Sequence, residues 1–192
     1  MKTVTENTRT VKANAALKAT KDMGLVALFT LIMAVCSWIS IPTAIPFTMQ
    51  TFGVFLTISI LGGKRGTMSI CLYLILGMLG APVFANGAAG MGALFGVTGG
   101  YLMSWAFAGP IMWLIETVFG RKNWTVALGM AASLFVCYAM GTAWFMVVYT
   151  RGMGQMNLQT ALSLCVTPFI IPDLAKLAMA MLAQKVVSSK VK

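Results

Sequence analysis

Residues 167–180 read TPFIIPDLAKLAMA, an apolar stretch in which one acid, Asp173, and one base, Lys176, stand three positions apart. A spacing of three places two side chains on one face of a helix, so they can pair or hold opposite ends of a polar ligand. A charge at the centre of a bilayer costs at least about 2.5 to 3.5 kcal/mol, and such charges usually mark a functional site. The alternative interpretation is a structural ion pair that locks two helices.

The composition of the whole chain places this stretch in a membrane protein. Of 192 residues, 59% are hydrophobic and 9% are charged, whereas a soluble domain carries about 25% charged residues. The apolar segments follow one another too closely to leave room for a soluble module or an enzyme domain. We therefore expect a single membrane domain at 23–187, between a basic cytoplasmic segment at 1–22 and a cytoplasmic tail at 188–192. The basic segment does not have the order of a cleaved signal, so the first apolar run is expected to stay as a span.

The remaining composition argues against several other classes of protein. The net charge is +10, but the basic residues follow the ends of the apolar segments, which disfavours nucleic acid as the partner. The chain has no histidine, the residue most used for metal ligation and for proton exchange near neutral pH. Its four cysteines stand singly in apolar segments without CxxC spacing, as small core residues do. We expect no metal site and no cofactor.

Six apolar runs are candidates for membrane-spanning helices, each of which needs about 20 residues. The second run is short, and the fifth is long enough to tilt. A further apolar run at 158–166 is followed by Pro168 and Pro172, so it is expected to form a short interfacial helix, with the last span beginning near Pro168. The six runs cover residues 23–41, 47–61, 67–85, 101–119, 124–148 and 168–187.

Lysine and arginine in short loops predict the orientation of these spans. With the amino terminus inside, 12 of the 14 basic residues fall on the inner side, the exceptions being Arg151 in an outer loop and Lys176. The expected fold is therefore all-α and polytopic, with six transmembrane helices and both termini in the cytoplasm. Asp173 and Lys176 would then be reachable from outside. Glu116 lies near an inner end, where pairing with Arg121 or Lys122 explains it.

The outer loop between the third and fourth spans, residues 85–101, contains six glycines. Glycine lets the backbone approach a ligand closely, and non-helical backbone at membrane depth is tolerated only where it lines a cavity or is covered by protein. We expect a lid or a re-entrant binding loop that includes Gly90, and a flexible connector is the alternative. The loop is not a phosphate-binding loop, because the Gly-Lys-Ser/Thr ending is missing.

Few polar side chains accompany these features on the outward side. Gln50, at the entry to the second span, and Asn86, at the start of the loop, carry amides that both donate and accept hydrogen bonds. Together with Asp173 and Lys176 they could bind an amide-like ligand. Aromatic residues could pack on its apolar body, although each of them also fits span packing. These aromatic residues are Phe47, Phe84, Tyr101 and Trp144.

Five short motifs, given at the end of this paragraph, resemble those of the BioY family and follow the order that they have in that family. Its members are the biotin-specific substrate-capture (S) components of energy-coupling factor (ECF) transporters. The resemblance extends from about residue 30 to residue 184. Two places depart from the family pattern: Val97 replaces a usual proline, and Ile171-Pro172-Asp173 lacks a glycine that is often found before the aspartate. The motifs are IPFTMQT at 45–51, KRG at 64–66, LGAPVFA at 79–85, GVTGGY at 96–101 and PDLAK at 172–176.

The resemblance implies six helices with biotin bound near the outer face, under the loop between spans three and four. It also implies that Asp173 and Asn86 meet the ureido group of biotin. Whether Lys176 meets the ring carbonyl or the carboxylate is open, and Arg151 is a second candidate for the carboxylate. The substrate-binding residues expected on this basis are Gln50, Asn86, Gly90, Tyr101, Asp173 and Lys176.

The expected function is high-affinity biotin capture and uptake across the bacterial cytoplasmic membrane. The chain has no Walker motif, so ATP would be used by partners, which the resemblance gives as a transmembrane coupling subunit and two cytoplasmic ATPases. Small residues permit close helix approach, and 15–24 of the first helix carries them at Ala15 and Ala19, and at Ala16, Thr20 and Gly24. The alternatives are an S component for another vitamin, such as riboflavin or thiamine, and a non-transporting membrane scaffold. An ion channel is disfavoured, because no ring of repeated charges is present.

Overall fold

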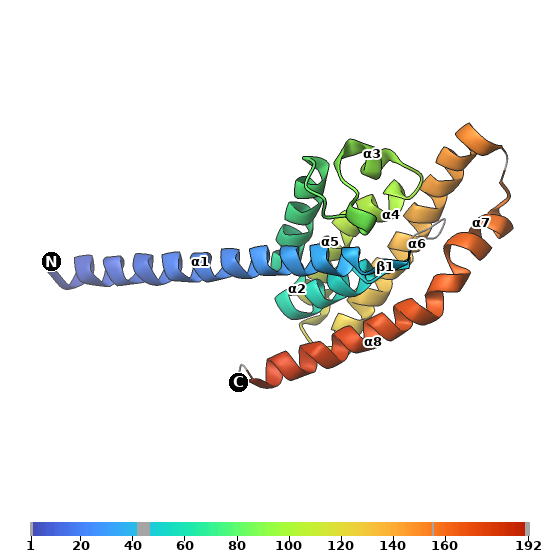
Figure 1. Cartoon of the computed structure of the whole chain (residues 1–192). Coiled ribbons are helices and arrows are strands. Elements are labelled where there is room, and N and C mark those ends of the chain that lie inside the picture. Colours follow the sequence, from blue (N-terminus) through green and yellow to red (C-terminus); the bar gives the residue numbers. More distant parts are fainter. Residues whose placement is uncertain (1, 42–46, 155, 191–192) are drawn as a thin grey trace.

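The computed structural model describes residues 2–41, 47–154 and 156–190, and these residues are almost entirely helical (Figure 1). The ends of the basic segment and of the tail, and Ile45 and Pro46 of the first motif, lie outside the described residues. One short antiparallel ribbon pairs β1 (Ser40–Ile41) with β2 (Phe47–Thr48). The helices are α1 (Lys2–Trp38), α2 (Gln50–Met78), η1 (Ala85–Gly87), α3 (Gly90–Phe95), α4 (Gly99–Ser104), η2 (Trp105–Phe107), α5 (Ala108–Phe119), α6 (Asn123–Met153), α7 (Leu158–Cys165) and α8 (Thr167–Lys190).

Helix α1 is continuous through the boundary at which we expected the first span to begin. The basic segment and the apolar run form one helix, and its amino-terminal part projects from the bundle (Figure 1). Alanines between 13 and 19 favour this continuity, because alanine has the highest helix propensity. The other end of α1 is held by Trp38, whose indole nitrogen donates a hydrogen bond to the Pro82 carbonyl at 2.7 Å.

Helix α2 contains the second and third expected spans as two arms, and the chain turns sharply between them at Gly62. The φ of Gly62 is 79°, a conformation that glycine adopts readily and other residues rarely do. A Cβ on Gly66 would lie 3.3 Å from Ile58 Cα, so the two arms pack closely near the turn. The connection expected at 62–66, between the second and third spans, is therefore shorter than expected and turns at Gly62, because Lys64 and Arg65 already belong to the second arm. That arm also ends at Met78 rather than at residue 85, since Gly80 adopts a φ of 103° and Pro82 cannot continue a helix.

The glycine-rich segment between residues 85 and 101 contains more helix than expected. It forms η1, α3 and the beginning of α4, joined by short extended stretches. Its apolar side chains explain part of this order, because Leu94 is buried in the core. The indole nitrogen of Trp144 on α6 also donates to the Gly96 carbonyl at 2.9 Å. The segment is thus packed against α6.

The carboxyl-terminal third follows the prediction more closely. Helix α6 covers the fifth expected span and continues beyond it to Met153. The expected short helix is present as α7, and α8 begins at Thr167, directly before Pro168. Pro172 lies inside α8, where its ring removes one helical hydrogen bond. Asp173 and Lys176 consequently stand early in the last helix, as expected.

Within the part of the chain that the structure describes, four helical stretches are long and apolar enough to cross a membrane. The two arms of α2 are each shorter than these. The described residues therefore form an almost entirely helical fold with the helix lengths and composition of a membrane protein, and the count of six crossings remains a prediction. The four stretches are Asn14–Trp38, Gly99–Phe119, Asn123–Gly152 and Leu158–Ser189.

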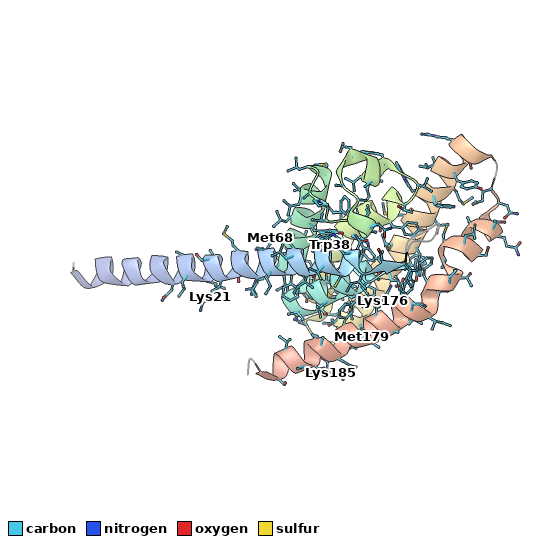
Figure 2. The ribbon with its side chains drawn as sticks, viewed as in Figure 1. Lys21, Trp38, Met68, Lys176, Met179 and Lys185 are labelled. Carbon is cyan, nitrogen blue, oxygen red and sulfur yellow. The ribbon has the colours of Figure 1, made fainter. Side chains whose placement is uncertain are left out.

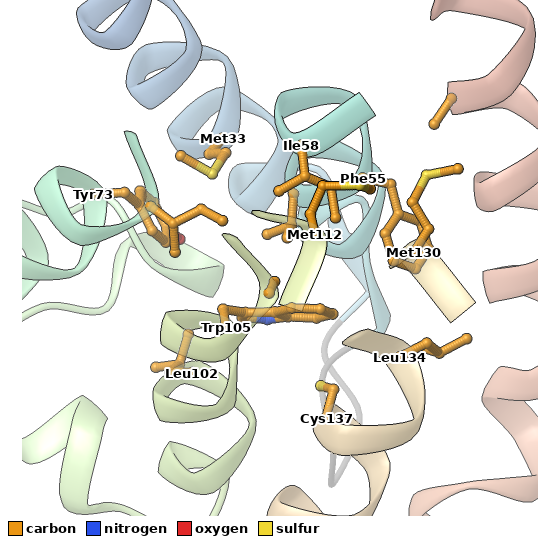
Figure 3. Close-up of a cluster of buried hydrophobic side chains, with 14 of the residues drawn as sticks. Met33, Phe55, Ile58, Tyr73, Leu102, Trp105, Met112, Met130, Leu134 and Cys137 are labelled. Atoms are coloured by element: carbon orange, nitrogen blue, oxygen red, sulfur yellow. The ribbon is translucent and has the colours of Figure 1, made fainter. Parts of the chain in front are cut away.

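The hydrophobic core joins α1, both arms of α2, α4, α5 and α6 (Figure 3). Trp105 belongs to this core and meets Phe55 edge to face, with ring centroids 6.3 Å apart. Tyr73 and Phe84 make a second edge-to-face pair at 5.5 Å. Such pairs add roughly 0.5 to 1.5 kcal/mol beyond the burial of their area. Since Trp105 and Phe84 also reach the cavity described below, the core forms one wall of the site.

A polar cluster lies at the end of the bundle away from the cavity described below. It surrounds the turn of α2 at Gly62, which we call the tip of α2. Glu116 pairs with Arg121 at 2.9 Å, as expected from sequence, and accepts a hydrogen bond from the Gly63 amide at 2.7 Å. Arg121 also donates to the carbonyls of Ser59 and Ile60 at the end of the first arm. These hydrogen bonds hold the turn between α5 and α6 against the tip of α2.

Candidate functional site

A cavity of about 370 Å³ lies among β2, α2, the glycine-rich segment, α4, α6, α7 and α8. This volume is within the range of about 300 to 1,000 Å³ that is usual for small-molecule sites. Among the described residues, Asp173 and Lys176 are the only charged side chains that line it. The lining residues are Thr48, Gln50, Thr51, Phe84, Ala85, Asn86, Ala88, Gly92, Ala93, Gly96, Thr98, Tyr101, Leu102, Trp105, Cys137, Tyr138, Cys165, Phe169, Asp173 and Lys176.

The two charged residues form a buried ion pair within α8. The Lys176 Nζ lies 2.8 Å from Asp173 Oδ1, and the two residues are only 4% and 3% exposed. The same nitrogen donates to the Thr48 carbonyl at 2.7 Å and lies 4.4 Å from the centroid of the Phe47 ring. A lysine ammonium has three hydrogens. Two therefore have acceptors, and the cation also rests on an aromatic face.

Asp173 is held from a second helix as well. Its other oxygen, Oδ2, accepts a hydrogen bond from the Tyr138 hydroxyl of α6 at 2.8 Å. Because Asp173 and Lys176 belong to the same helix, their ion pair by itself joins no two helices. The links to other elements run through Thr48 and Tyr138, so a structural role for this network remains the alternative to a binding role.

Gln50 lies at the start of α2 and is buried against the second arm. Its side-chain nitrogen donates to the Tyr73 hydroxyl at 3.0 Å, and Tyr73 donates in turn to the Val83 carbonyl at 2.9 Å. This chain joins both arms of α2 to the segment before η1. Gln50 is thus fixed at the cavity wall, and its side-chain oxygen can accept a hydrogen bond.

Asn86 and Gly90 lie in the glycine-rich segment, but only Asn86 lines the cavity. Asn86 adopts a left-handed φ of 56°, which asparagine tolerates better than most residues. Its Oδ1 accepts a hydrogen bond from Ser40 at 2.6 Å, which leaves the amide nitrogen as a donor. Gly90 instead begins α3 with a φ of 78° and is not among the lining residues.

The aromatic residues expected at the site divide into two groups. Phe84 and Tyr101 line the cavity, and the Tyr101 hydroxyl lies 3.3 Å from that of Thr142. Phe47 packs on Lys176 and stacks with Phe169 at 6.1 Å. Trp144 instead binds the backbone of the glycine-rich segment. The expected aromatic wall is therefore only partly formed by the residues expected to make it.

Arg151, expected as an alternative partner for a ligand carboxylate, lies away from this cavity. It stands near the carboxyl end of α6, beside Met146 and Thr150. Figure 2 shows Lys176 among the packed helices, whereas Lys21 and Lys185 lie nearer to the two termini. The charge available to a ligand in the cavity is thus confined to Asp173 and Lys176 within the described residues.

Several lining residues were not expected from the sequence. Tyr138, Cys137 and Trp105 lie in the interior of predicted spans, where nothing in the local pattern separates a lining residue from a core residue. Phe169 follows Pro168 at the start of the last span, and its place beside the charged pair could have been noticed. The exposed part of the lining is concentrated at Asn86, Ala88 and Gly92, all in the glycine-rich segment.

Comparisons with known proteins agree with this architecture. The model of the BioY family matches residues 6–192. The chain is 37% identical to "Biotin transporter BioY" of Thermotoga maritima over 156 residues, which cover 81% of this chain and 88% of that protein. It is 32% identical to "Biotin transporter BioY2" of Lactococcus lactis, over 81% of this chain and 83% of that protein.

A solved structure also has the same fold. It is described as the S-component for biotin from an ECF-type ABC transporter, and it matches with a TM-score of 0.78. The match covers 90% of this chain and 93% of that chain, at 20% sequence identity.

Proposed function

The chain belongs to the BioY family, and from this we propose that it captures biotin in the cavity beside Asp173 and serves the uptake of biotin as the S component of an ECF transporter. The single observation that carries the assignment to this cavity is the buried pair of Asp173 and Lys176 at its wall. Buried charges in a membrane domain are costly and usually functional. The relatives named as biotin transporters supply the ligand.

The chemistry of biotin fits the distribution of groups around the cavity. Its ureido ring has two N–H donors and one carbonyl acceptor. Asp173 would accept one N–H, and the amide nitrogen of Asn86 would donate to the carbonyl. Its fused apolar rings would pack on Leu102, Trp105 and Phe84, which belong to the core. Lys176 already donates one hydrogen bond to Asp173 and one to the Thr48 carbonyl. We therefore expect Lys176 to stay paired with Asp173 rather than to pair with the biotin carboxylate.

The carboxylate would then point toward the exposed part of the lining. Asn86, Ala88 and Gly92 form that part, and the described residues offer no further cation inside the cavity. We propose that the segment from η1 to α4 acts as a lid over the bound vitamin, with Gly90 shaping the start of α3. A carboxylate near the opening keeps most of its hydration, which avoids the cost of burying an unpaired charge.

Binding of radiolabelled biotin to the purified protein tests this function directly. We expect saturable binding that unlabelled biotin displaces, while riboflavin and thiamine do not. Displacement by riboflavin or thiamine instead would support the S component for another vitamin. Absence of binding for all three would support the scaffold interpretation, in which the ion pair has only a structural role.

We further propose six membrane crossings, with both termini in the cytoplasm of a bacterial cell. The arms of α2 would be the second and third crossings. Contacts at the polar end support this arrangement, because Arg121 follows α5 and also reaches the carbonyls of Ser59 and Ile60 at the tip of α2. The tip of α2 therefore lies at the same end of the bundle as the turn between α5 and α6.

The proposed partners are a transmembrane coupling subunit and ATPases, which would supply the energy that this chain has no motif to obtain. Small residues on α1 offer a docking face for the coupling subunit. Ala15, Ala16, Ala19, Thr20 and Gly24 are all exposed, and a Cβ on Gly24 would have no neighbour within 4 Å. The face is thus free to receive another helix.

Substitution on this face tests the docking proposal. We expect Gly24→Leu and Ala19→Leu to reduce co-purification of the coupling subunit by about tenfold or more, because a bulky side chain prevents close helix approach. Biotin binding to the isolated chain should not change. Leu25→Phe, on another side of α1, is the control. Undiminished co-purification of both leucine variants would show that docking uses a different surface.

A further inference from the structure

The hydroxyl of Tyr138 is in direct contact with the charged pair, although the function as proposed so far gives it no role. Tyr138 lines the cavity from α6, and its hydroxyl donates to Asp173 Oδ2 at 2.8 Å. The other carboxylate oxygen, Oδ1, accepts from Lys176 at 2.8 Å. Each oxygen of Asp173 thus carries one donor, and the two donors come from different helices. Together they fix the direction in which the carboxylate plane faces.

The remaining hydrogen-bonding capacity of this cluster consists mainly of acceptors. A carboxylate can accept about four hydrogen bonds, and Asp173 receives two within the described residues. Lys176 directs hydrogens at Asp173 and Thr48 and rests on the Phe47 ring. The acceptor positions of the Asp173 carboxylate that Tyr138 and Lys176 do not occupy therefore suit the N–H donors of a ligand.

We propose that Tyr138 is a positioning residue, which orients the Asp173 carboxylate so that it accepts the ureido N–H of the ligand. This inference rests on the proposed binding of biotin. A carboxylate held by Lys176 alone could rotate, and its accepting lone pairs would then point away from the ligand. Tyr138 therefore contributes to the recognition of N–H donors without itself bonding to them.

The first experiment compares Tyr138→Phe with the wild type in equilibrium binding of radiolabelled biotin. The substitution removes the hydroxyl and keeps the ring, and we expect binding to weaken by about tenfold, as for loss of one hydrogen bond to a charged group. Tyr149→Phe is the matched control, because Tyr149 lies on the same helix, stacks on Phe145 and does not line the cavity. It should bind as the wild type does.

The second experiment separates positioning from a general structural role. Two biotin derivatives, each methylated on one ureido nitrogen, are measured with the same variants. For the derivative that lacks the N–H facing Asp173, Tyr138→Phe should change affinity by less than about threefold, because coupled losses are not additive. For the same reason, Tyr138→Phe should have little further effect on biotin binding in an Asp173→Asn background.

The outcomes distinguish this inference from the function on which it rests. Wild-type protein that binds no biotin would contradict the proposed function. Wild-type protein that binds biotin, with Tyr138→Phe either unchanged or equally weakened for biotin and both derivatives, would overturn the role of Tyr138 alone. Full additivity of Tyr138→Phe and Asp173→Asn would also overturn it.

Discussion

At the scale of single residues, the buried pair in α8 can be explained either by stability or by binding. Asp173 and Lys176 are buried to nearly the same degree and are bonded to each other, to Tyr138 and to Thr48. Removing one partner of a buried ion pair costs about 3 to 5 kcal/mol, whereas replacing both by neutral groups is often tolerated. The two explanations therefore differ in what a double substitution restores.

We expect Asp173→Asn and Lys176→Met each to lower the thermal unfolding temperature and to weaken biotin binding. The double variant should recover most of the unfolding temperature, since no uncompensated charge remains. It should not recover biotin binding, because the carboxylate that accepts the ureido N–H is absent. The measurement is thermal unfolding in detergent beside equilibrium binding of biotin. Recovery of both properties would favour the purely structural ion pair.

The sequence predicted these two residues for a physical reason that does not extend to their neighbours. A charge in an apolar stretch is conspicuous because of its cost, and the spacing of three placed both groups on one helix face. Tyr138 carries no such cost, since tyrosine is common in spans. Its role depends on how α6 packs against α8, which no local pattern determines. Sequence reasoning therefore found the charged pair and missed the residue that orients it.

At the scale of elements, the turn within α2 depends on one glycine. Gly62 has a φ of 79°, and a Cβ on it would meet the Arg121 guanidinium and lie 3.2 Å from the Glu116 carboxylate. The turn and the polar cluster that closes it therefore occupy the same space. A side chain at this position would strain the backbone and displace Arg121 from the carbonyls of the first arm.

We expect Gly62→Ala to lower the free energy of unfolding by about 1 to 3 kcal/mol, as for a residue forced into a left-handed conformation. Gly152→Ala is the control, because Gly152 lies in α6 and a Cβ on it would have no neighbour within 4 Å. That substitution should be neutral or slightly stabilising, since alanine favours a helix over glycine. Chemical denaturation in detergent gives both values, and equal effects of the two substitutions would contradict this role for Gly62.

Element boundaries were predicted well where proline or a long apolar run marked them, and less well where glycine did. The start of α8 at Thr167 followed from Pro168. The connection between the second and third spans was expected to take residues 62–66, although the single residue Gly62 suffices and leaves Lys64 and Arg65 helical. Glycines in the segment 85–101 were likewise expected to form loop. Several of them lie in α3 and α4, because packing of Leu94 and Trp144 decides their conformation.

At the scale of the whole molecule, the polar cluster and the cavity lie at opposite ends of the first arm of α2. Gln50 opens the first arm at the cavity, and Gly62 closes that arm beside Arg121. The second arm returns, so that Tyr73 again meets Gln50. If the turn between α5 and α6 faces the cytoplasm, as its basic residues predict, the cavity opens to the outside, where biotin must be captured.

Accessibility of single cysteines in intact cells tests this arrangement. Starting from a variant without native cysteines that still binds biotin, we introduce Lys64→Cys, Lys122→Cys and Gln159→Cys, all at exposed positions. A membrane-impermeant maleimide should label residue 159 from outside, and residues 64 and 122 only after permeabilisation. Residue 122 reports the orientation, whereas residue 64 reports whether α2 crosses the membrane. Labelling of residue 64 from outside, with residue 122 protected, would mean that α2 enters and leaves on the outer side and that the chain has four crossings. That outcome would conflict with the contact of Arg121 with the tip of α2, so the two observations together decide between four crossings and six.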